Sequence, residues 1–346
     1  MQALAIDVGG TKLAAAVVTD AGRILGRHQV PTPRSGDAAT VFGAVCQAAD
    51  GALAAAGIEI YDYDDVRAVA LSGQPGPSER PVLLEPPAAP RVDGALAGIG
   101  VATAGPLDAR AGTVSPVNIG AWRDFPLRDR LAQRYALPVR MFGDAVAVTV
   151  AEHWLGAARG LGNVLGMVVS TGVGGGLILD GRVVPGAGGN AGHIGHISID
   201  PAGPVCACGG IGCLEAVASG TSIARWAAEH TSDRDVPLRT TTAVAEAARA
   251  GDEIALAAMR RAAEAIGMAV AGAVTLLDLD RVVIGGGVAH AFDLLAQPMD
   301  AAYRRYAALG YAARPRIVAA ELGGDAGILG AAAVVLKPDD YWPRNA

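Results

Sequence analysis

LAIDVGGTKLAAAVVTDAGRIL, residues 4 to 25, has the same order of features as VLGMVVSTGVGGGLILDGRVV, residues 164 to 184. Each stretch contains an apolar strand, a Gly-rich turn with a threonine, a second apolar strand, a D-A-G-R or D-G-R turn and a third strand. This repetition predicts an internally duplicated chain. Helical segments, clearest at 37–56 and 253–277, alternate with strands elsewhere. We therefore expect a two-domain α/β protein with a cleft between the domains.

Three further stretches complete this outline. VRAVALS, residues 66–72, predicts another strand, and the Pro-rich stretch 74–94 predicts a surface loop or linker because proline fixes φ and lacks an N–H donor. The uncharged run Gly160 to Leu179 is long enough to span a membrane. Because Gly and Asn interrupt it, we interpret it as two strands around a turn.

Composition restricts the possible partners. The chain has 346 residues, half of them apolar, and a net charge of −6 with acids and bases interspersed. No strong field therefore attracts nucleic acid or an anionic membrane. The first residues, MQALAIDVGG, lack the basic flank and apolar run of a signal peptide. We expect a soluble, cytoplasmic protein without nucleic-acid or membrane partners, in which clustered cysteines hold a metal more often than they form disulfides.

The turn DVGGTK, Asp7 to Lys12, has the composition of an anion-binding loop. Gly9 and Gly10 allow the backbone to approach an anion and to offer it N–H groups. Asp7 could hold a metal ion or its waters, while Thr11 and Lys12 supply a hydroxyl and a cation. Taken alone, the motif is equally consistent with a hairpin turn that needs a positive φ.

Two other Gly-rich turns favour a phosphate-binding interpretation. STGVGGG, residues 170–176, matches the first turn, and IGGGV, residues 284–288, offers a third close approach of the backbone. The candidate residues in these turns are Thr171, Gly172, Gly285, Gly286 and Gly287. Three such turns predict a nucleoside triphosphate site, although none is a Walker loop or a strand–GxGxxG–helix unit.

Asp144 follows a predicted strand (PVRMFG) and begins a predicted helix. By position alone it is an N-cap, which is the more common role for an aspartate there. A helix N-terminus also stabilises the ionised carboxylate, so the group would be a weak base at neutral pH. Such a base suits phosphoryl transfer, in which the acceptor hydroxyl loses its proton late.

Three of the four cysteines lie in CACGGIGC. Cys206, Cys208 and Cys213 have C-x-C-x4-C spacing, and His196 lies ten residues upstream of the first. Three thiolates and an imidazole form a closed tetrahedral shell suited to structural zinc. The alternative, buried unreactive thiols, fits a polar and Gly-rich loop poorly. His193 would not be needed as a ligand and would pack, cap or bind something else.

Together these motifs resemble the ROK family of repressors and sugar kinases. The resemblance extends from DVGGTK through GDA, STGVGGG, GHIGH and CACGGIGCLE to GGDAGILGAA. It implies a two-lobed, actin-like sugar-kinase fold with duplicated mixed sheets. Residues 1–142 with about 328–346 would form the small lobe, and residues 143–327 would form the large lobe. It also implies MgATP as phosphoryl donor, a hexose or hexosamine acceptor phosphorylated on its 6-hydroxyl, and a homodimer.

The resemblance also assigns roles to single residues. Asp144 would be the catalytic base, His196 would link zinc to the sugar, and Glu215 and Gly105 would contact the sugar. Two positions depart from the usual family pattern: Gly143 replaces an asparagine, and His193 replaces the glutamate of many glucokinases. The form AGHIGH…DPAGPVCACG, together with LAIDVGGTKLAAA and PTPRS, looks more like bacterial N-acetylmannosamine kinases. Because of His193, we therefore expect N-acetylmannosamine ahead of glucose.

Two hypotheses from other classes remain. ROK repressors carry an N-terminal DNA-binding domain, whereas this sequence begins at the first strand without a basic recognition helix. The second alternative is a non-catalytic sugar-binding protein, which Gly143 suggests. The presence of Asp7, Asp144 and the glycine turns argues against it, because binding alone does not need Asp144.

Overall fold

Large and small side chains alternate along strand β1 (Gln2–Val8). Leu4, Ile6 and Val8 belong to the core cluster that includes helix α1 (Ala38–Ala55). Ala3 and Ala5 are also buried but lie outside that cluster. Because successive side chains of a strand point to opposite faces, one face of this sheet carries large apolar groups and the other carries methyl groups.

The computed structural model describes residues 1–59, 96–231, 238–313 and 315–342. The strand expected at 66–72 and the Pro-rich loop 74–94 lie outside these residues. The described chain divides into two compact units, each treated by itself below. Unit 1 comprises Met1–Asp144 with Ala331–Ala346, and unit 2 comprises Ala145–Gly330.

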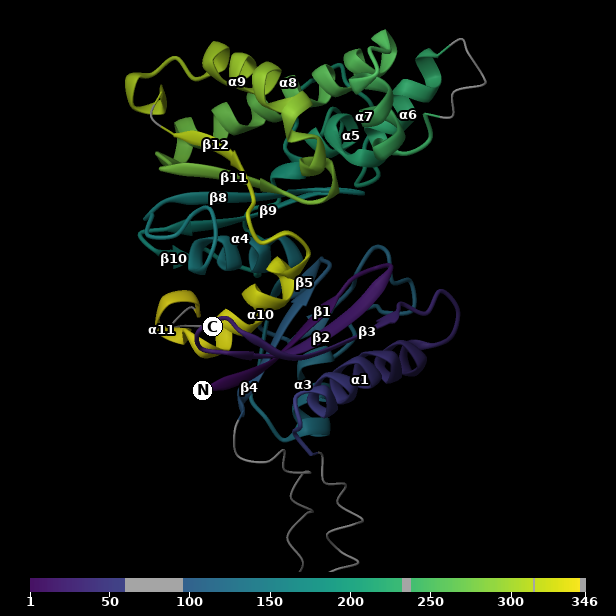
Figure 1. Cartoon of the computed structure of the whole chain (residues 1–346), viewed down its shortest axis with the longest axis vertical. Helices are drawn as coiled ribbons and strands as arrows, with labels where there is room; N and C mark the ends of the chain where they lie inside the picture. Colours follow the sequence, from purple (N-terminus) through teal and green to yellow (C-terminus); the bar gives the residue numbers. More distant parts are fainter. Residues whose placement is uncertain (60–95, 232–237, 314, 343–346) are drawn as a thin grey trace, which may run out of the picture. The chain divides into compact units, whose positions relative to one another are not determined.

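Unit 1 contains a five-stranded mixed sheet in the order β3-β2-β1-β4-β7, of which Figure 1 labels β1 to β4. Strand β1 pairs antiparallel with β2, and β2 with β3, whereas β1, β4 and β7 are parallel. The other strands are β2 (Lys12–Thr19), β3 (Ile24–Pro31), β4 (Leu96–Thr103) and β7 (Val139–Gly143). A short β5–β6 hairpin (Leu107–Asp108, Thr113–Val114) and α3 (Leu127–Tyr135) lie between β4 and β7 in the chain.

Unit 2 repeats this arrangement as β10-β9-β8-β11-β12. Its strands are β8 (Val164–Val169), β9 (Val173–Leu179), β10 (Arg182–Val183), β11 (Arg281–Gly285) and β12 (Arg316–Ala319). Strands β8, β9 and β10 form an antiparallel meander, and β8, β11 and β12 are parallel. The predicted α/β class and the internal duplication are therefore confirmed. The run 160–179 forms two strands joined by a turn, as expected.

Helices cover both faces of each sheet. In unit 1, α1 and α3 contribute to the large-side-chain core, and α10 (Ala326–Leu336) contacts β4 through backbone, because a Cβ at Gly100 would overlap the carbonyl of Ala331. In unit 2, α4 (Asp144–Trp154) makes a similar close contact, since a Cβ at Gly176 or Gly166 would overlap Thr149. Small residues thus allow one helix to approach each sheet closely.

The remaining helices of unit 2 lie on one large core. They are η1 (Ile194–His196), α5 (Leu214–Ala218), α6 (Gly220–His230), α7 (Thr241–Arg249), α8 (Glu253–Leu277), η2 (Gly287–Ala291), α9 (Phe292–Tyr306) and η3 (Gly310–Ala313). The short η4 (Gly323–Asp325) precedes α10, and α11 (Pro338–Tyr341) follows it. The long helix begins and ends where the sequence predicted.

Within the described residues, α1 is the one helix long and apolar enough to cross a membrane by length and composition. The side chains of Val41, Val45 and Leu53 on one face of this helix are fully buried in the core cluster of unit 1. Its N-cap is Asp37, whose carboxylate accepts a hydrogen bond from the Thr40 N–H. The helix therefore packs on the sheet face that carries the large side chains.

A buried carboxylate fixes the end of α4 to the segment that precedes α10. Glu152 is 1% exposed. Its carboxylate accepts hydrogen bonds from the N–H groups of Ala157 (2.9 Å), Glu321 (3.0 Å) and Leu322 (2.8 Å). A Cβ at Gly330 would in turn overlap the carbonyl of Ala147 in the first turn of α4. Both ends of α4 are thus held by the segment around α10.

We predict that Glu152→Ala lowers the free energy of unfolding of unit 2 by about 3 kcal/mol, because it leaves one buried and two partly buried N–H groups without their acceptor. Urea unfolding measures this change. The control is Glu321→Ala, whose exposed side chain is not part of the network and whose effect should stay within about 0.5 kcal/mol. Equal stability of the two variants would contradict the proposed role of the Glu152 carboxylate.

Candidate functional site

Three parallel strands of unit 1 end at the same edge of their sheet. In the register of β1, β4 and β7, Val8 pairs with Thr103, and Thr103 pairs with Gly143. Asp7 therefore lies one residue before this line, and Asp144 lies one residue after it. The carboxyl edge of parallel strands is where α/β proteins gather functional side chains.

The two carboxylates at this edge influence each other. Partial burial, followed in size by the charge of Asp144, raises the pKa of Asp7 from 3.8 to about 6, although Lys12 and Arg27 oppose the shift. Two nearby carboxylates favour sharing a proton or binding a cation. The pair therefore has the chemistry of a divalent-cation site and of a group that can accept a proton from a substrate.

The turn that follows β1 is held by its own backbone and by Thr32. The N–H of Gly9 donates to the carbonyl of Lys12 (3.1 Å), and the Thr32 hydroxyl donates to the carbonyl of Gly9 (2.7 Å). Thr11 and Lys12 are exposed. A Cβ at Gly10 would overlap the Asn118 side chain, so Gly10 is needed here for space.

Asn118 belongs to the loop that begins at Gly105, after β4. The carbonyl of Gly105 accepts a hydrogen bond from the N–H of Val117 (3.3 Å), which returns this loop to the sheet edge. The sequence analysis did not identify Asn118, because nothing in SPVNIG marks its amide as a neighbour of the glycine turn. Asp7, Gly10, Gly105 and Asn118 thus belong to one region of unit 1.

The corresponding turn of unit 2 joins β8 to β9. The N–H of Ser170 donates to the carbonyl of Gly172 (2.8 Å), the N–H of Gly220 donates to the carbonyl of Ser170 (2.7 Å), and the Thr221 hydroxyl donates to the carbonyl of Thr171 (3.0 Å). The start of α6 therefore supports this turn. The three glycines that follow, 174–176, lie inside β9, where side chains would meet α4 or Gly192.

A pocket of about 630 Å³ lies beside this turn in unit 2. The N-terminal residues of three helices border it: Gly220 and Thr221 of α6, Thr241 and Thr242 of α7, and Gly287 of η2. The pocket is further lined by Ser170, Thr171, Ala224, Arg225, Ala228, Arg239, Thr240 and Val288. Helix N-termini and guanidinium groups favour anions, so the pocket suits a phosphorylated ligand.

Of the predicted glycines, Gly287 lines this pocket, whereas Gly285 and Gly286 are not among its lining residues. Gly286 has φ +88°, and a Cβ there would overlap the carbonyl of Val169, so it serves a tight strand end. The sequence analysis missed Arg225 and Arg239. No spacing rule connects α6 to the segment before α7, so only the tertiary structure identifies these residues.

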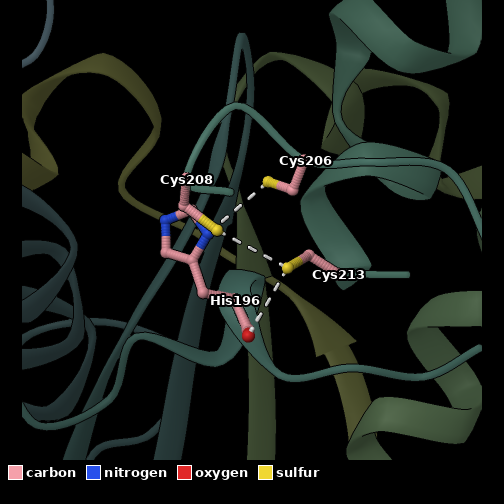
Figure 2. A group of neighbouring side chains, drawn as sticks. All are labelled: His196, Cys206, Cys208 and Cys213. Atoms are coloured by element: carbon pink, nitrogen blue, oxygen red, sulfur yellow. Dashed lines mark hydrogen bonds between the residues drawn. The ribbon is translucent and has the colours of Figure 1, made fainter. Parts of the chain in front are cut away.

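The predicted metal ligands converge in unit 2. The ligand atoms of His196, Cys206, Cys208 and Cys213 lie within 4.8 Å of one another (Figure 2). The Cys208 and Cys213 sulfurs are 3.7 Å apart, and His196 Nδ1 lies 3.9 Å from the Cys206 sulfur. Two thiolates bound tetrahedrally at zinc would be roughly 3.8 Å apart, so the spacing fits that ion.

The protonation chemistry of the cluster also calls for a cation. Burial and the neighbouring sulfurs raise the pKa of the Cys213 thiol to about 12. The N–H of Gly210 donates to the Cys208 sulfur (3.4 Å) and lowers the pKa of that thiol. Ionisation of the Cys213 thiol at neutral pH therefore needs a positive ion to offset its charge.

The predicted sugar-binding residues of unit 2 lie next to this cluster. The rings of His193 and His196 are stacked with centroids 6.2 Å apart. His193 Nδ1 lies 2.8 Å from the carbonyl of Asn190, which can only accept, so Nδ1 carries the proton and Nε2 remains an acceptor in the neutral ring. Glu215 is half-buried, and its Oε2 accepts a hydrogen bond from the N–H of Val173 (2.8 Å).

Comparison with known proteins places this chain among sugar kinases in sequence and in fold. Residues 3–60 and 87–338 match the model of the ROK family. A glucokinase of Halalkalibacterium halodurans is 33% identical over 98% of this chain and 96% of its own length. An N-acetylmannosamine kinase of Pasteurella multocida is 35% identical over 96% of this chain and 95% of its own length. A ROK family glucokinase from Streptomyces griseus, solved with glucose and AMPPNP, is 31% identical, with a TM-score of 0.74, over 96% of this chain and 99% of its own.

The carboxylate pair yields a prediction for stability. Because the pKa of Asp7 is raised to about 6, the stability cost of its ionisation is absent below about pH 4 and complete above about pH 6. At pH 8 and without added magnesium, the free energy of unfolding of Asp7→Asn should therefore be about 2 kcal/mol higher than that of wild type. At pH 4 this difference should nearly vanish. Urea unfolding at both pH values measures it.

The control is Asp20→Asn. Asp20 is exposed, and its hydrogen bond with the N-terminal ammonium lowers its pKa, so this variant should gain no stability at pH 8. A gain that is equal for both variants, or independent of pH, would refute the assignment.

Proposed function

Because the chain belongs to the ROK family, as its motifs predicted, we propose that it is an ATP-dependent kinase that phosphorylates a hexose or N-acetylhexosamine at the 6-hydroxyl. The observation that carries the proposal is the pairing of Asp7 and Asp144 at the carboxyl edge of the parallel strands, beside a glycine turn. One carboxylate serves the metal–phosphate end of the reaction and the other serves the acceptor hydroxyl.

In unit 1, Asp7 would hold magnesium or its waters, and bound magnesium would neutralise charge on the β- and γ-phosphates. Gly9 and Gly10 would bring backbone N–H groups towards the phosphates, with Thr11 and Lys12 adding a hydroxyl and a positive charge. Asp144 would accept the proton of the 6-hydroxyl as the hydroxyl oxygen attacks the γ-phosphorus and the bond from that phosphorus to the β–γ bridging oxygen breaks, releasing ADP. Because the transition state is loose, orienting that hydroxyl matters more than the basicity of Asp144.

Unit 2 would bind the nucleotide along the turn of Thr171 and Gly172 and in the adjacent pocket. The pocket volume of about 630 Å³ is within the range of small-molecule sites. Arg225 and Arg239 would complement the negative charge of the nucleotide, and Gly287 leaves the start of η2 open to it. Gly285 and Gly286 would support this region through the backbone.

The residues that would contact the sugar are Gly105 in unit 1 and His193, His196 and Glu215 in unit 2. With Nδ1 facing the cysteine sulfurs, His196 would keep Nε2 for a sugar hydroxyl. His193 Nε2 is an acceptor where many glucokinases have a carboxylate, and a neutral acceptor suits the N–H of an N-acetyl group. We therefore favour N-acetylmannosamine as the acceptor, with glucose next.

We further propose that His196, Cys206, Cys208 and Cys213 hold structural zinc, supported by their spacing and by the need for a compensating charge. Zinc would keep the imidazole and the three thiolates in one arrangement and so fix the orientation of His196. Cysteines that bind a metal rather than form disulfides are typical of a reducing compartment, which supports a cytoplasmic location. A homodimer, implied by the family resemblance, stays a prediction.

ADP release with a panel of hexoses and N-acetylhexosamines identifies the acceptor. On that acceptor, Asp144→Asn should lower kcat by about 10² to 10⁴, because the amide cannot accept the proton. Sugar affinity, measured by calorimetry, should largely survive. Near-wild-type turnover would remove Asp144 from its proposed role, and the absence of turnover with every sugar would favour a sugar-sensing regulator or a non-catalytic sugar-binding protein.

Cys208→Ser should lose most of the bound zinc, because three ligands hold the ion far more weakly than four. Elemental analysis of the purified protein gives the metal content. The matched control is Cys46→Ser in α1, which should keep one zinc per chain because that cysteine lies outside the cluster. A wild-type protein without zinc would refute this part of the proposal.

A further inference from the structure

Val173, the first residue of β9, is held on both sides of its peptide backbone. Its N–H donates to Glu215 Oε2 at 2.8 Å. Its carbonyl lies directly against Gly195, where a Cβ would overlap the carbonyl oxygen. Val173 is 4% exposed, so water offers little replacement for either contact. Two segments distant in the sequence thus contact the two peptide groups that flank the Val173 Cα, where the turn from β8 enters β9.

Both of these segments carry metal-site residues. Gly195 directly precedes His196, and Glu215 lies two residues after Cys213. One link between the segments is backbone pairing, in which Leu214 N–H donates to the carbonyl of Ile197 (3.0 Å). Another is the Cys/His cluster, where the Cys213 sulfur lies 3.6 Å from the carbonyl of His196. The backbone pairing and the Cys/His cluster thus both join the two segments that contact Val173.

The same turn is supported from α6, and this support also involves Glu215. The Ser222 hydroxyl donates to the carbonyl of Glu215 (2.9 Å), while the N–H of Gly220 donates to the carbonyl of Ser170 (2.7 Å). A Cβ at Gly172 would lie 2.6 Å from Glu215 Oε2, so the absence of a side chain there lets the carboxylate lie close to the turn. Glu215 thus contacts both the turn and α6, which together supply residues that border the pocket.

We propose that Glu215 is a positioning residue that couples the metal cluster to the nucleotide turn, so that zinc binding strengthens nucleotide binding even when no sugar is present. This inference rests on the proposed function, in which the turn of Thr171 and Gly172 binds ATP. It adds to the sugar contact of Glu215 rather than replacing it, because Oε1 remains for a sugar hydroxyl. A coupling of this kind is reciprocal: bound nucleotide should also slow the loss of zinc.

The test is a thermodynamic cycle that combines one substitution with the removal of zinc. It uses the full-length protein and Mg·AMPPNP, a non-hydrolysable nucleotide, in the absence of sugar. Calorimetry gives the affinity of wild type and Glu215→Asp, each before and after zinc is removed with a chelator. Aspartate keeps the charge but is one methylene too short to reach the Val173 N–H. We expect about tenfold weaker binding in wild type without zinc and about tenfold weaker binding in zinc-loaded Glu215→Asp.

The decisive quantity is the combined effect. In Glu215→Asp, removing zinc should weaken Mg·AMPPNP binding by less than about twofold, because this variant already lacks the contact between Glu215 and Val173. Effects that multiply, or a wild-type affinity unchanged by zinc removal, would overturn the inference while leaving the kinase proposal intact. Failure of zinc-loaded wild type to bind Mg·AMPPNP would overturn both.

Glu215→Gln separates the positioning role from the sugar contact. Glutamine keeps the length and one acceptor oxygen for Val173, so it should restore nucleotide affinity to within about threefold of wild type while still weakening sugar binding. Equal losses of nucleotide affinity in the Gln and Asp variants would contradict the geometry proposed for Oε2.

Gly195→Ala disturbs the other side of Val173 without changing a metal ligand. It should weaken Mg·AMPPNP binding and speed hydrogen exchange of the Val173 amide while zinc content stays at one per chain. The matched control is Gly188→Ala in the loop that precedes η1, where the nearest atom to a Cβ would be 3.6 Å away, and it should change neither quantity. Unchanged exchange at Val173 in both variants would count against the proposal.

Discussion

The parallel register of β1, β4 and β7 determines what unit 1 can do. Because these strands run the same way and end together, Asp7, the loop of Gly105 and Asp144 reach one edge without any special loop conformation. The interaction between the Asp7 and Asp144 carboxylates follows directly from this register, and it destabilises the protein that has no cation bound. A site assembled from strand ends depends on the sheet rather than on flexible segments, which suits a reaction that needs an accurately placed hydroxyl.

Much of this architecture could be predicted from local sequence patterns. The repeated strand–turn–strand pattern predicted the two similar sheets, since each repeat carries its own apolar periodicity and turn residues. The C-x-C-x4-C spacing with His196 predicted the cluster, because a short Gly-rich loop leaves few ways to arrange its sulfurs. In both cases the residues that form the pattern and the residues that form the structure lie in one stretch of fewer than about 25 residues.

Other features depend on contacts that no local pattern encodes. In the sequence Glu152 is an ordinary helical glutamate. Its carboxylate nevertheless accepts hydrogen bonds from the N–H groups of Glu321 and Leu322, far along the chain. Arg225 and Arg239 become neighbours only through the packing of α6 and α7. The glycines at 174–176 attracted a phosphate-binding interpretation, but inside β9 their lack of side chains makes room for α4 and Gly192. Composition alone cannot distinguish a glycine that lets the backbone approach a ligand from one that makes room for a packed helix.

The two connections between the units run through helices rather than loops. The division falls between Asp144 and Ala145 at the start of α4, and between Gly330 and Ala331 in the middle of α10. Limited proteolysis, which needs an extended and accessible backbone, should therefore not release the two units as separate fragments at these points. Fusion of a reporter domain is similarly unsuited to these positions, and anyone engineering this enzyme as a biosensor would have to begin from other surfaces.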